Sequence, residues 1–207
     1  MNAKGSATPE VVVFDLGKVL LDFDYGIATR KLAEQSGVSH DTVRTVIDQS
    51  ALLYAYETGK MTSDDFYKEV CRNTGFRGDM DVFSASFSDI FTPIEPMIAL
   101  HGRLREHSVP TYIFSNTNPI AIAHIRRQFP FFANFDGYVL SYEHRSMKPD
   151  FVLYEVVEKK TGKSGPQILY IDDRPENIET GKGRGWQVIH HTDAGKTIAA
   201  VESLKLV

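Results

Sequence analysis

The sequence of 207 residues contains a single cysteine, so no disulfide bond can form within the chain. We interpret Cys71 as a small, buried apolar side chain on a helix, in a protein of the reducing cytoplasm. No apolar run approaches the roughly 18 residues that a membrane-spanning helix requires. Residues 1–6 lack the apolar core of a signal peptide. Together these absences predict a cytoplasmic protein that has no membrane partner.

An excess of positive charge is also missing from the chain. Its 23 lysine and arginine residues stand against 27 aspartate and glutamate residues, which gives a net charge of -4. Such a chain offers neither a basic field for nucleic acid nor a polybasic surface for lipid headgroups, so we expect neither partner. A small phosphorylated metabolite would therefore have to be held by local groups. The sequence does not predict the oligomeric state.

Five short apolar segments predict the strands of a parallel sheet. Residues 11–14 form a continuous apolar run, as expected for a parallel strand that is buried on both faces. The other predicted strands are residues 111–114, 138–140, 168–171 and 187–190. Helical patterns lie between them at residues 119–129 and 150–160. This alternation predicts an α/β fold class with a Rossmann-like parallel sheet as its core.

Residues 22–92 interrupt this alternation and contain no convincing strand. Helical patterns cover residues 27–37, 42–56 and 63–73, and Ser63 and Asp64 are suited to cap the third of these helices. We therefore expect an inserted all-helical cap, residues 22–92, and a core made of residues 9–21 and 93–207. An insertion after the first strand would cover the carboxyl ends of the strands, where open α/β sheets bind ligands.

Polar residues suited to phosphoryl chemistry follow the first two predicted strands. Asp15 comes directly after the first strand, where a carboxylate can attack phosphorus and form an aspartyl phosphate. Ser115 and Asn116 follow the second strand, and a hydroxyl group with adjacent backbone amides can hold phosphate oxygens. The alternative for each site is an ordinary turn, since these residue types also stabilise turns.

Lys148 stands immediately before Pro149. The proline disfavours a helical conformation at Lys148 and suits the first turn of the helix that follows. A lysine fixed in this way can point into a site as a positive charge, which neutralises a nucleophile and a developing phosphoryl charge. The alternative is a solvated lysine on the surface.

Asp172 and Asp173 end the fourth predicted strand. Two adjacent carboxylates at a buried strand end repel one another, so a cation would stabilise them. Mg²⁺ prefers one or two carboxylates together with water and phosphate oxygens. Asn177 could orient such a ligand. The alternative is that Asp173 caps the helix that begins after it.

These segments, in this order and with these spacings, resemble the haloacid dehalogenase superfamily of hydrolases. The likeness covers nearly the whole chain, because the helical insertion is similar to the first-position cap of that superfamily. The resemblance implies that Asp15 is the nucleophile and that Ser115 is the phosphate-binding hydroxyl. It also implies that Lys148 and the Asn116 amide hold the phosphoryl group.

The same resemblance implies a magnesium site. Asp172 and Asp173 match the acidic pair of the superfamily, with Asp173 as a direct metal ligand and Asp172 as a direct or water-mediated one. Asp15 would be a further ligand. The residue two positions after the nucleophile supplies a backbone carbonyl to the metal in this superfamily, and that residue is Gly17 here. The implied cofactor is therefore Mg²⁺.

Gly17 also marks a departure from the superfamily pattern, because a second aspartate usually stands at that position. That aspartate protonates the leaving oxygen and activates water, and general acid–base help of this kind is worth about 10² to 10⁴ in rate. The enzyme could instead accept substrates whose leaving group needs little protonation, such as anomeric sugar phosphates or acyl phosphates. Lys18, Asp22 or Asp24 could also substitute in part. A third alternative is a protein that binds phosphate compounds without efficient turnover.

A finer resemblance involves residues 14–24, 56–66 and 171–178. They are similar to a branch of the superfamily that has glycine two positions after the nucleophile. This branch includes bacterial sugar-phosphate phosphatases, among them a glucose-1-phosphate phosphatase, and the phosphatase domains of some epoxide hydrolases resemble its acidic pair.

These observations predict a Mg²⁺-dependent phosphatase that hydrolyses a small phosphorylated metabolite, for example a sugar phosphate, through an aspartyl phosphate on Asp15. The alternatives are a catalytically weak phosphate-binding protein and a 2-haloacid dehalogenase. A dehalogenase needs no metal, so the Asp172–Asp173 pair argues against it. The inward-facing residues of the insertion would select the substrate. Candidates for this role, each with packing or surface charge as its alternative, are Tyr54, Tyr56, Glu57 and Arg30.

Overall fold

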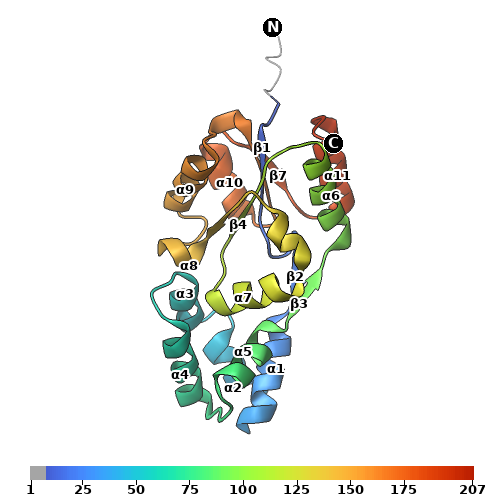
Figure 1. Ribbon diagram of the computed structural model, residues 1–207. Coiled ribbons are helices and arrows are strands. Elements are labelled where there is room, and N and C mark those ends of the chain that lie inside the picture. Colours follow the sequence, from blue (N-terminus) through green and yellow to red (C-terminus); the bar gives the residue numbers. More distant parts are fainter. Residues whose placement is uncertain (1–7) are drawn as a thin grey trace.

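The computed structural model describes residues 8–207, so the signal-peptide prediction for residues 1–6 lies outside the described residues. An α/β part forms one end of the molecule, and a purely helical part forms the other (Figure 1). Among the described helices, none is long and apolar enough to cross a membrane. The fold class is therefore the predicted one, a Rossmann-like parallel sheet with a helical insertion.

A five-stranded parallel sheet forms the centre of the α/β part, in the order β5-β4-β1-β6-β7. All four residues of β1 are buried on the two faces, which explains their continuous apolar character. The five predicted strands are confirmed. Their bounds are β1 Val11–Phe14, β4 Thr111–Ser115, β5 Gly137–Leu140, β6 Ile168–Asp172 and β7 Gln187–His190.

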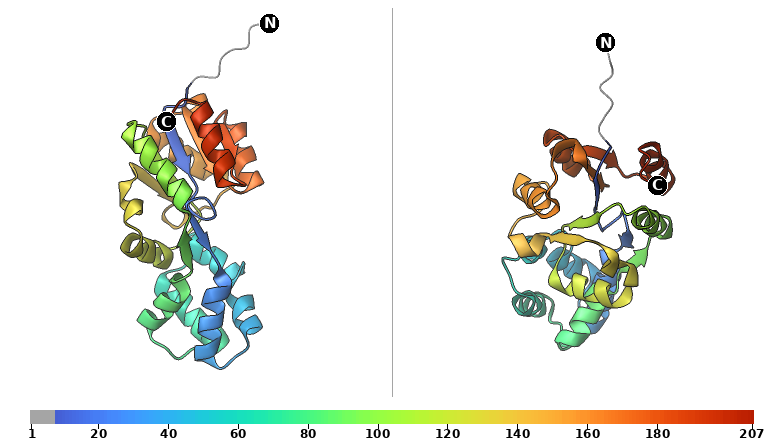
Figure 2. Two further views of the ribbon diagram at one scale, coloured as in Figure 1. Left: turned by 90° about the vertical axis from the view of Figure 1, so that its right-hand side faces the viewer. Right: turned by 45° about the horizontal axis from the view of Figure 1, so that its top comes forward.

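Helices cover both faces of this sheet (Figures 1 and 2). Val12 and Phe14 point into one apolar cluster, and Val11 and Val13 point into a second cluster on the opposite face. The helices of this part are α6 Glu95–Glu106, α7 Pro119–Gln128, α8 Ser141–His144, α9 Phe151–Thr161, α10 Pro175–Gly183 and α11 Ala194–Ser203, with short 3₁₀ helices at Pro130–Asn134 and Gly165–Gln167.

The start of α9 differs from the prediction made from Pro149. The helix begins at Phe151, and Asp150 is its N-cap, because the Asp150 side chain accepts a hydrogen bond from the backbone N–H of Val152. Pro149 therefore precedes the cap and does not belong to the first helical turn. An aspartate side chain at the N-cap accepts a hydrogen bond from a free helical N–H, whereas a proline side chain has no acceptor atom for this role.

The helical part contains five helices and differs from the prediction at three points. Residues 42–56 form two helices, because Gln49 has a positive φ of 50° and Ser50 starts a new helix by capping it. The cap of the next helix is Thr62, not Ser63 or Asp64. One helix was not predicted at all, α5. The bounds are α1 Tyr25–Ser36, α2 His40–Ile47, α3 Ala51–Glu57, α4 Ser63–Thr74 and α5 Met80–Ser88.

The expectation that residues 22–92 contain no strand is wrong at both ends of the segment. Strands β2 (Leu21–Phe23) and β3 (Phe91–Pro93) pair in antiparallel fashion where the two parts of the molecule meet. Strands of three residues carry too little alternation to be recognised in a sequence. The insertion therefore leaves and re-enters the core through one two-stranded ribbon.

The helical part has an apolar cluster of its own, centred on aromatic rings. The ring of Phe66 stacks on Tyr56 with a centroid distance of 4.4 Å, and it also contacts Phe83 and Phe87. Cys71 lies on α4 as predicted for a helical residue, and it is partly buried against this cluster.

Three close contacts dock the helical part on the core. The Tyr56 hydroxyl accepts a hydrogen bond from the backbone N–H of Ile120 at 3.2 Å, and Ser141 Oγ donates to the carbonyl of Glu57 at 2.6 Å. Gly59 has a φ of +63°, and a Cβ atom there would lie 2.0 Å from the carbonyl oxygen of Tyr142. Only glycine permits this backbone approach.

A substitution at Gly59 tests this docking contact. We expect Gly59→Ala to lower the free energy of unfolding by at least about 1 kcal/mol more than Gly162→Ala does. Gly162 is the matched control, because its φ of +66° is similar and a Cβ atom there would have no neighbouring atom within 4 Å. Urea denaturation of both variants measures the difference. Equal losses in the two variants would contradict a close approach at Gly59.

Candidate active site

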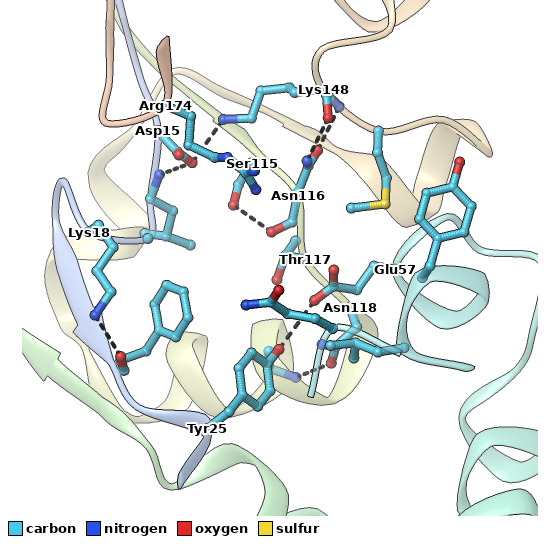
Figure 3. A pocket seen from close by; sticks show the side chains of 18 of the residues that line it. Asp15, Lys18, Tyr25, Glu57, Ser115, Asn116, Thr117, Asn118, Lys148 and Arg174 are labelled. Carbon is cyan, nitrogen blue, oxygen red and sulfur yellow. Dashed lines mark hydrogen bonds and ion pairs between the residues drawn. The ribbon is translucent and has the colours of Figure 1, made fainter. Parts of the chain in front are cut away.

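The polar residues predicted at the strand ends meet at one edge of the sheet. Asp15 directly follows β1, Ser115 ends β4, and Asp172 ends β6, while β1 pairs with both of the other strands. They converge because parallel neighbours end on the same side of a sheet. Lys148 reaches this edge from the loop between α8 and α9. A cavity of about 630 Å³ opens here between the sheet and the helical insertion (Figure 3).

Lys148 is buried and makes two ion pairs at this edge. Its Nζ lies 3.0 Å from Asp15 Oδ1 and 2.7 Å from Asp172 Oδ2, and it donates to the carbonyl of Phe114 at 2.8 Å. Burial by itself would lower the pKa of Lys148, but the two carboxylates together raise the pKa above its usual value. The ammonium therefore stays charged, and the alternative of a solvated surface lysine is wrong.

Asp172 is completely buried and accepts hydrogen bonds from several donors. Besides the Lys148 ammonium, these are the Tyr170 hydroxyl, the backbone N–H of Arg174 at 2.8 Å, and Asn177 Nδ2 at 3.0 Å. Burial tends to raise the pKa of Asp172, yet Lys148, the Tyr170 hydroxyl and the backbone N–H of Arg174 lower it below the usual value. Asp172 is thus an ionised carboxylate whose acceptor positions are filled by the protein.

The pKa values of Asp15 and Asp173 are raised, in contrast to that of Asp172. Burial raises the pKa of Asp15 to about 8, with Asp172 and Asp173 adding to the rise and Lys148 opposing it. Burial and the charge of Asp172 likewise raise the pKa of Asp173, which is half-buried. Oxygen atoms of the three carboxylates lie within 4.8 Å of one another. One lysine cannot balance three carboxylates, and a set of oxygen donors around excess negative charge suits Mg²⁺.

Asp173 does not cap the helix that follows it, so this alternative is wrong. The N-cap of α10 is Arg174, and no side chain caps that helix. The backbone N–H of Arg174 is bound by Asp172 instead. The side chain of Asp173 lines the cavity.

Asn116 positions the loop that carries Lys148. Its Nδ2 donates to the carbonyl of Lys148 at 3.0 Å, and its Oδ1 accepts from the Lys148 backbone N–H at 2.8 Å. Sequence reasoning considered only the backbone amide of Asn116 and missed this role of its side chain. Ser115 Oγ donates to the carbonyl of Asn116 at 3.3 Å and faces the cavity (Figure 3).

An aromatic ring occupies the space beside Gly17. A Cβ atom at Gly17 would lie 2.7 Å from Cε1 of Phe23, so a side chain fits there only if that ring moves.

Among the predicted substitutes for the missing acid, Lys18 lines the cavity and pairs with Asp22. Asp24 is the N-cap of α1. Neither of these two aspartates lines the cavity.

The insertion contributes two of its four predicted specificity residues to the cavity, Tyr54 and Glu57. The packing alternative holds for Tyr56, which is buried, and the surface alternative holds for Arg30, which is exposed and lies 3.5 Å from Asp24. Sequence reasoning missed several residues of the cavity. These are Phe23, Tyr25 and Asn118.

Two curated proteins are similar to this chain over most of their length. A sesquiterpene phosphatase of Aspergillus oryzae is 26% identical over 200 residues, which is 95% of this chain and 97% of that protein. A D-ribitol-5-phosphate phosphatase of Bacteroides thetaiotaomicron is 24% identical over 184 residues, which is 85% of this chain and 88% of that protein.

A solved structure shares the fold. It is a HAD family enzyme of Bacteroides thetaiotaomicron in complex with magnesium and inorganic phosphate, and it superposes with a TM-score of 0.79 at 21% identity, covering 90% of this chain and 96% of that chain. The family model for haloacid dehalogenase-like hydrolases matches residues 9–185. Because this match spans most of the 207 residues, the protein belongs to the haloacid dehalogenase-like hydrolases.

Proposed function

We propose that the protein is a Mg²⁺-dependent phosphatase that hydrolyses a small phosphorylated metabolite through an aspartyl phosphate on Asp15. The observation that carries this proposal is the group of three carboxylates around one buried ammonium at the sheet edge. The two curated relatives named as phosphatases support it.

We also propose a cytoplasmic location, on the basis of the single cysteine.

Asp15, Asp173 and the carbonyl of Gly17 are the proposed direct ligands of Mg²⁺. All three residues line the cavity, whereas the acceptor positions of Asp172 are filled, so we place Asp172 behind a water ligand. When bound, the cation neutralises charge on the phosphoryl oxygens. The solved relative in complex with magnesium and phosphate supports this choice of metal.

The chain's own residues carry the two steps of the reaction. A carboxylate oxygen of Asp15 attacks phosphorus while the bond from phosphorus to the leaving oxygen breaks, and the leaving oxygen takes up a proton from water, since no acid stands at Gly17. Water then hydrolyses the aspartyl phosphate and releases inorganic phosphate. Ser115, the Asn116 amide and Lys148 hold the phosphoryl group, and the fixed position of Lys148 means that no charge must reorganise during transfer.

The two alternatives receive less support from the geometry. A 2-haloacid dehalogenase uses its aspartate on carbon and needs no metal, so it has no need of the excess carboxylate charge around Asp15. A weak phosphate-binding protein would explain the absence of an acid at Gly17. It would not explain the ion pair that keeps Lys148 beside the proposed nucleophile.

Removing the nucleophile tests the activity directly. We expect Asp15→Asn to lower Mg²⁺-dependent phosphate release from p-nitrophenyl phosphate by about 10⁴-fold or more, because no aspartyl phosphate can form. The matched control is Asp41→Asn, whose carboxylate is exposed on α2. Circular dichroism checks that both variants fold. Full activity in Asp15→Asn would refute the nucleophile assignment.

Substitutions of Asp173 and Asp172 should have different effects, the first on Mg²⁺ dependence and the second on stability. We expect Asp173→Asn to raise the Mg²⁺ concentration needed for half-maximal activity about tenfold or more, since a ligand is removed. Asp172→Asn should instead lower the free energy of unfolding by about 3 kcal/mol, because Lys148 loses a buried partner. Phosphate release measured over a range of Mg²⁺ concentrations and urea denaturation report the two effects. The reverse pattern would exchange the two roles.

The space beside Gly17 can be engineered to restore an acid. We expect Gly17→Asp alone to give no gain, because the ring of Phe23 blocks the side chain. Combined with Phe23→Ala, it should raise kcat for an alkyl phosphate about tenfold or more relative to Phe23→Ala, with a smaller effect on p-nitrophenyl phosphate, whose leaving group needs little protonation. A double variant without a change in this preference would show that the missing acid does not limit turnover.

A further inference from the structure

Glu57 brings a carboxylate from the insertion into the cavity. It is the last residue of α3, and Figure 3 shows its side chain across the cavity from Asp15, beside Asn118 and Tyr25. Its backbone carbonyl is bound by Ser141 Oγ, which also accepts from the backbone N–H of Thr117 at 2.9 Å. Glu57 is therefore held in a fixed position relative to the loop that follows β4.

Asn118 presents an unpaired donor at the same place. The residue is 1% exposed, and its Oδ1 accepts a hydrogen bond from the backbone N–H of Ala121 at 2.9 Å, as the N-cap of α7. This cap fixes the orientation of the amide group. Asn118 Nδ2 then has no hydrogen-bond partner among residues 8–207, although it is buried and the residue lines the cavity. A buried donor without a protein partner is rare, and it calls for a partner from water or from a ligand.

Glu57 retains acceptor capacity beside this donor. Tyr25 donates its hydroxyl to Glu57 Oε1 at 3.2 Å, and an ionised carboxylate can accept about four hydrogen bonds. Burial raises the pKa of Glu57 to about 7, and the hydrogen bond from Tyr25 opposes this rise in part. The Asn118 amide lies near enough to oppose it as well, although its Nδ2 does not meet hydrogen-bond geometry with Glu57. The carboxylate is thus poorly hydrated and would gain from a hydrogen-bond donor on a ligand.

The charges of the cavity limit what that ligand can be. Within the described chain, the insertion contributes Asp48 and Glu57 to the lining but no lysine or arginine. The cationic lining residues Lys18, Lys148 and Arg174 lie outside the insertion. A second negative charge on the leaving group would therefore meet carboxylates on the insertion side.

Resting on the phosphatase activity proposed above, we propose that Glu57 and Asn118 form a subsite that binds a hydroxyl group of the leaving group. Glu57 accepts the hydrogen bond of this hydroxyl, and Asn118 Nδ2 donates to its oxygen. The substrates are phosphate monoesters of hydroxylated compounds that carry no second anionic group. A hydrocarbon leaving group would strip water from both polar groups and leave them unpaired, so it is disfavoured despite the apolar side chains that also line the cavity.

The test compares D-ribitol 5-phosphate with n-pentyl phosphate, which has the same chain length and lacks the hydroxyl groups. We expect the wild type to prefer the ribitol ester in kcat/KM. Glu57→Gln should lower the ratio of the two kcat/KM values about tenfold or more, mainly through KM for the ribitol ester. Glu34→Gln is the matched control, because it makes the same change on an exposed position of α1. An n-pentyl preference in the wild type would overturn the subsite.

The same substrates separate hydroxyl binding from proton donation. If Glu57 were the missing general acid, Glu57→Gln would lower kcat for both alkyl esters equally and spare p-nitrophenyl phosphate. Equal losses of this kind would overturn the subsite. Asn118→Asp provides a second variant, because it keeps the oxygen that caps α7 and replaces the donor amide. It should also lower the ratio of kcat/KM for the ribitol and pentyl esters, and an unaltered ratio would remove Asn118 from the subsite.

Binding can be measured apart from turnover. Calorimetric titration of the Asp15→Asn variant with the two esters, with and without Glu57→Gln, reports the affinity of a protein that cannot form the aspartyl phosphate. A ribitol preference that Glu57→Gln abolishes supports the subsite even if the wild type releases no phosphate, an outcome that would overturn only the phosphatase. Equal affinities for the two esters in Asp15→Asn would overturn the subsite alone.

Discussion

Lys148 holds its ammonium between two buried carboxylates that end neighbouring strands. Without this cation, Asp15 and Asp172 would face each other unscreened in a site of low dielectric, and the pKa of Asp15, which burial already raises to about 8, would rise further. The arrangement around Lys148 is rigid. The Asn116 side chain is hydrogen-bonded to both the backbone N–H and the backbone carbonyl of Lys148, and the carbonyl of Phe114 accepts a hydrogen bond from its ammonium. Positions of charge at this sheet edge are therefore set before any ligand arrives.

The core and the sheet-edge residues could be predicted because two simple rules apply to them. A parallel strand buried on both faces is a continuous apolar run, as in residues 11–14. Parallel strands end on one side, so Asp15, Ser115 and Asp172 had to lie together once the strands were known. The sequence could not show that the acceptor positions of Asp172 are filled, because the donors that fill them come from other parts of the chain.

The insertion was predicted less well for physical reasons that differ from place to place. A single pattern over residues 42–56 hid the break at Gln49, where a positive φ ends the helical run without a glycine. Phe23 beside Gly17 and Asn118 beside Glu57 are contacts between segments, and no local pattern encodes them. The role of Asn118 as the N-cap of α7 and its unpaired amide nitrogen both emerge only from the folded geometry.

The pairing of β2 with β3 means that both ends of the insertion emerge at one point, with Leu21 opposite Pro93. To the core, residues 22–92 are therefore equivalent to a closed loop, and lengthening such a loop adds little to the entropic cost of closing it. Mutation can rebuild this segment with little effect on the strands that carry the carboxylates, provided that contacts such as those of Ser141 and Gly59 are kept. The ribbon thus lets the insertion vary in length and sequence while the strands at the sheet edge keep their positions.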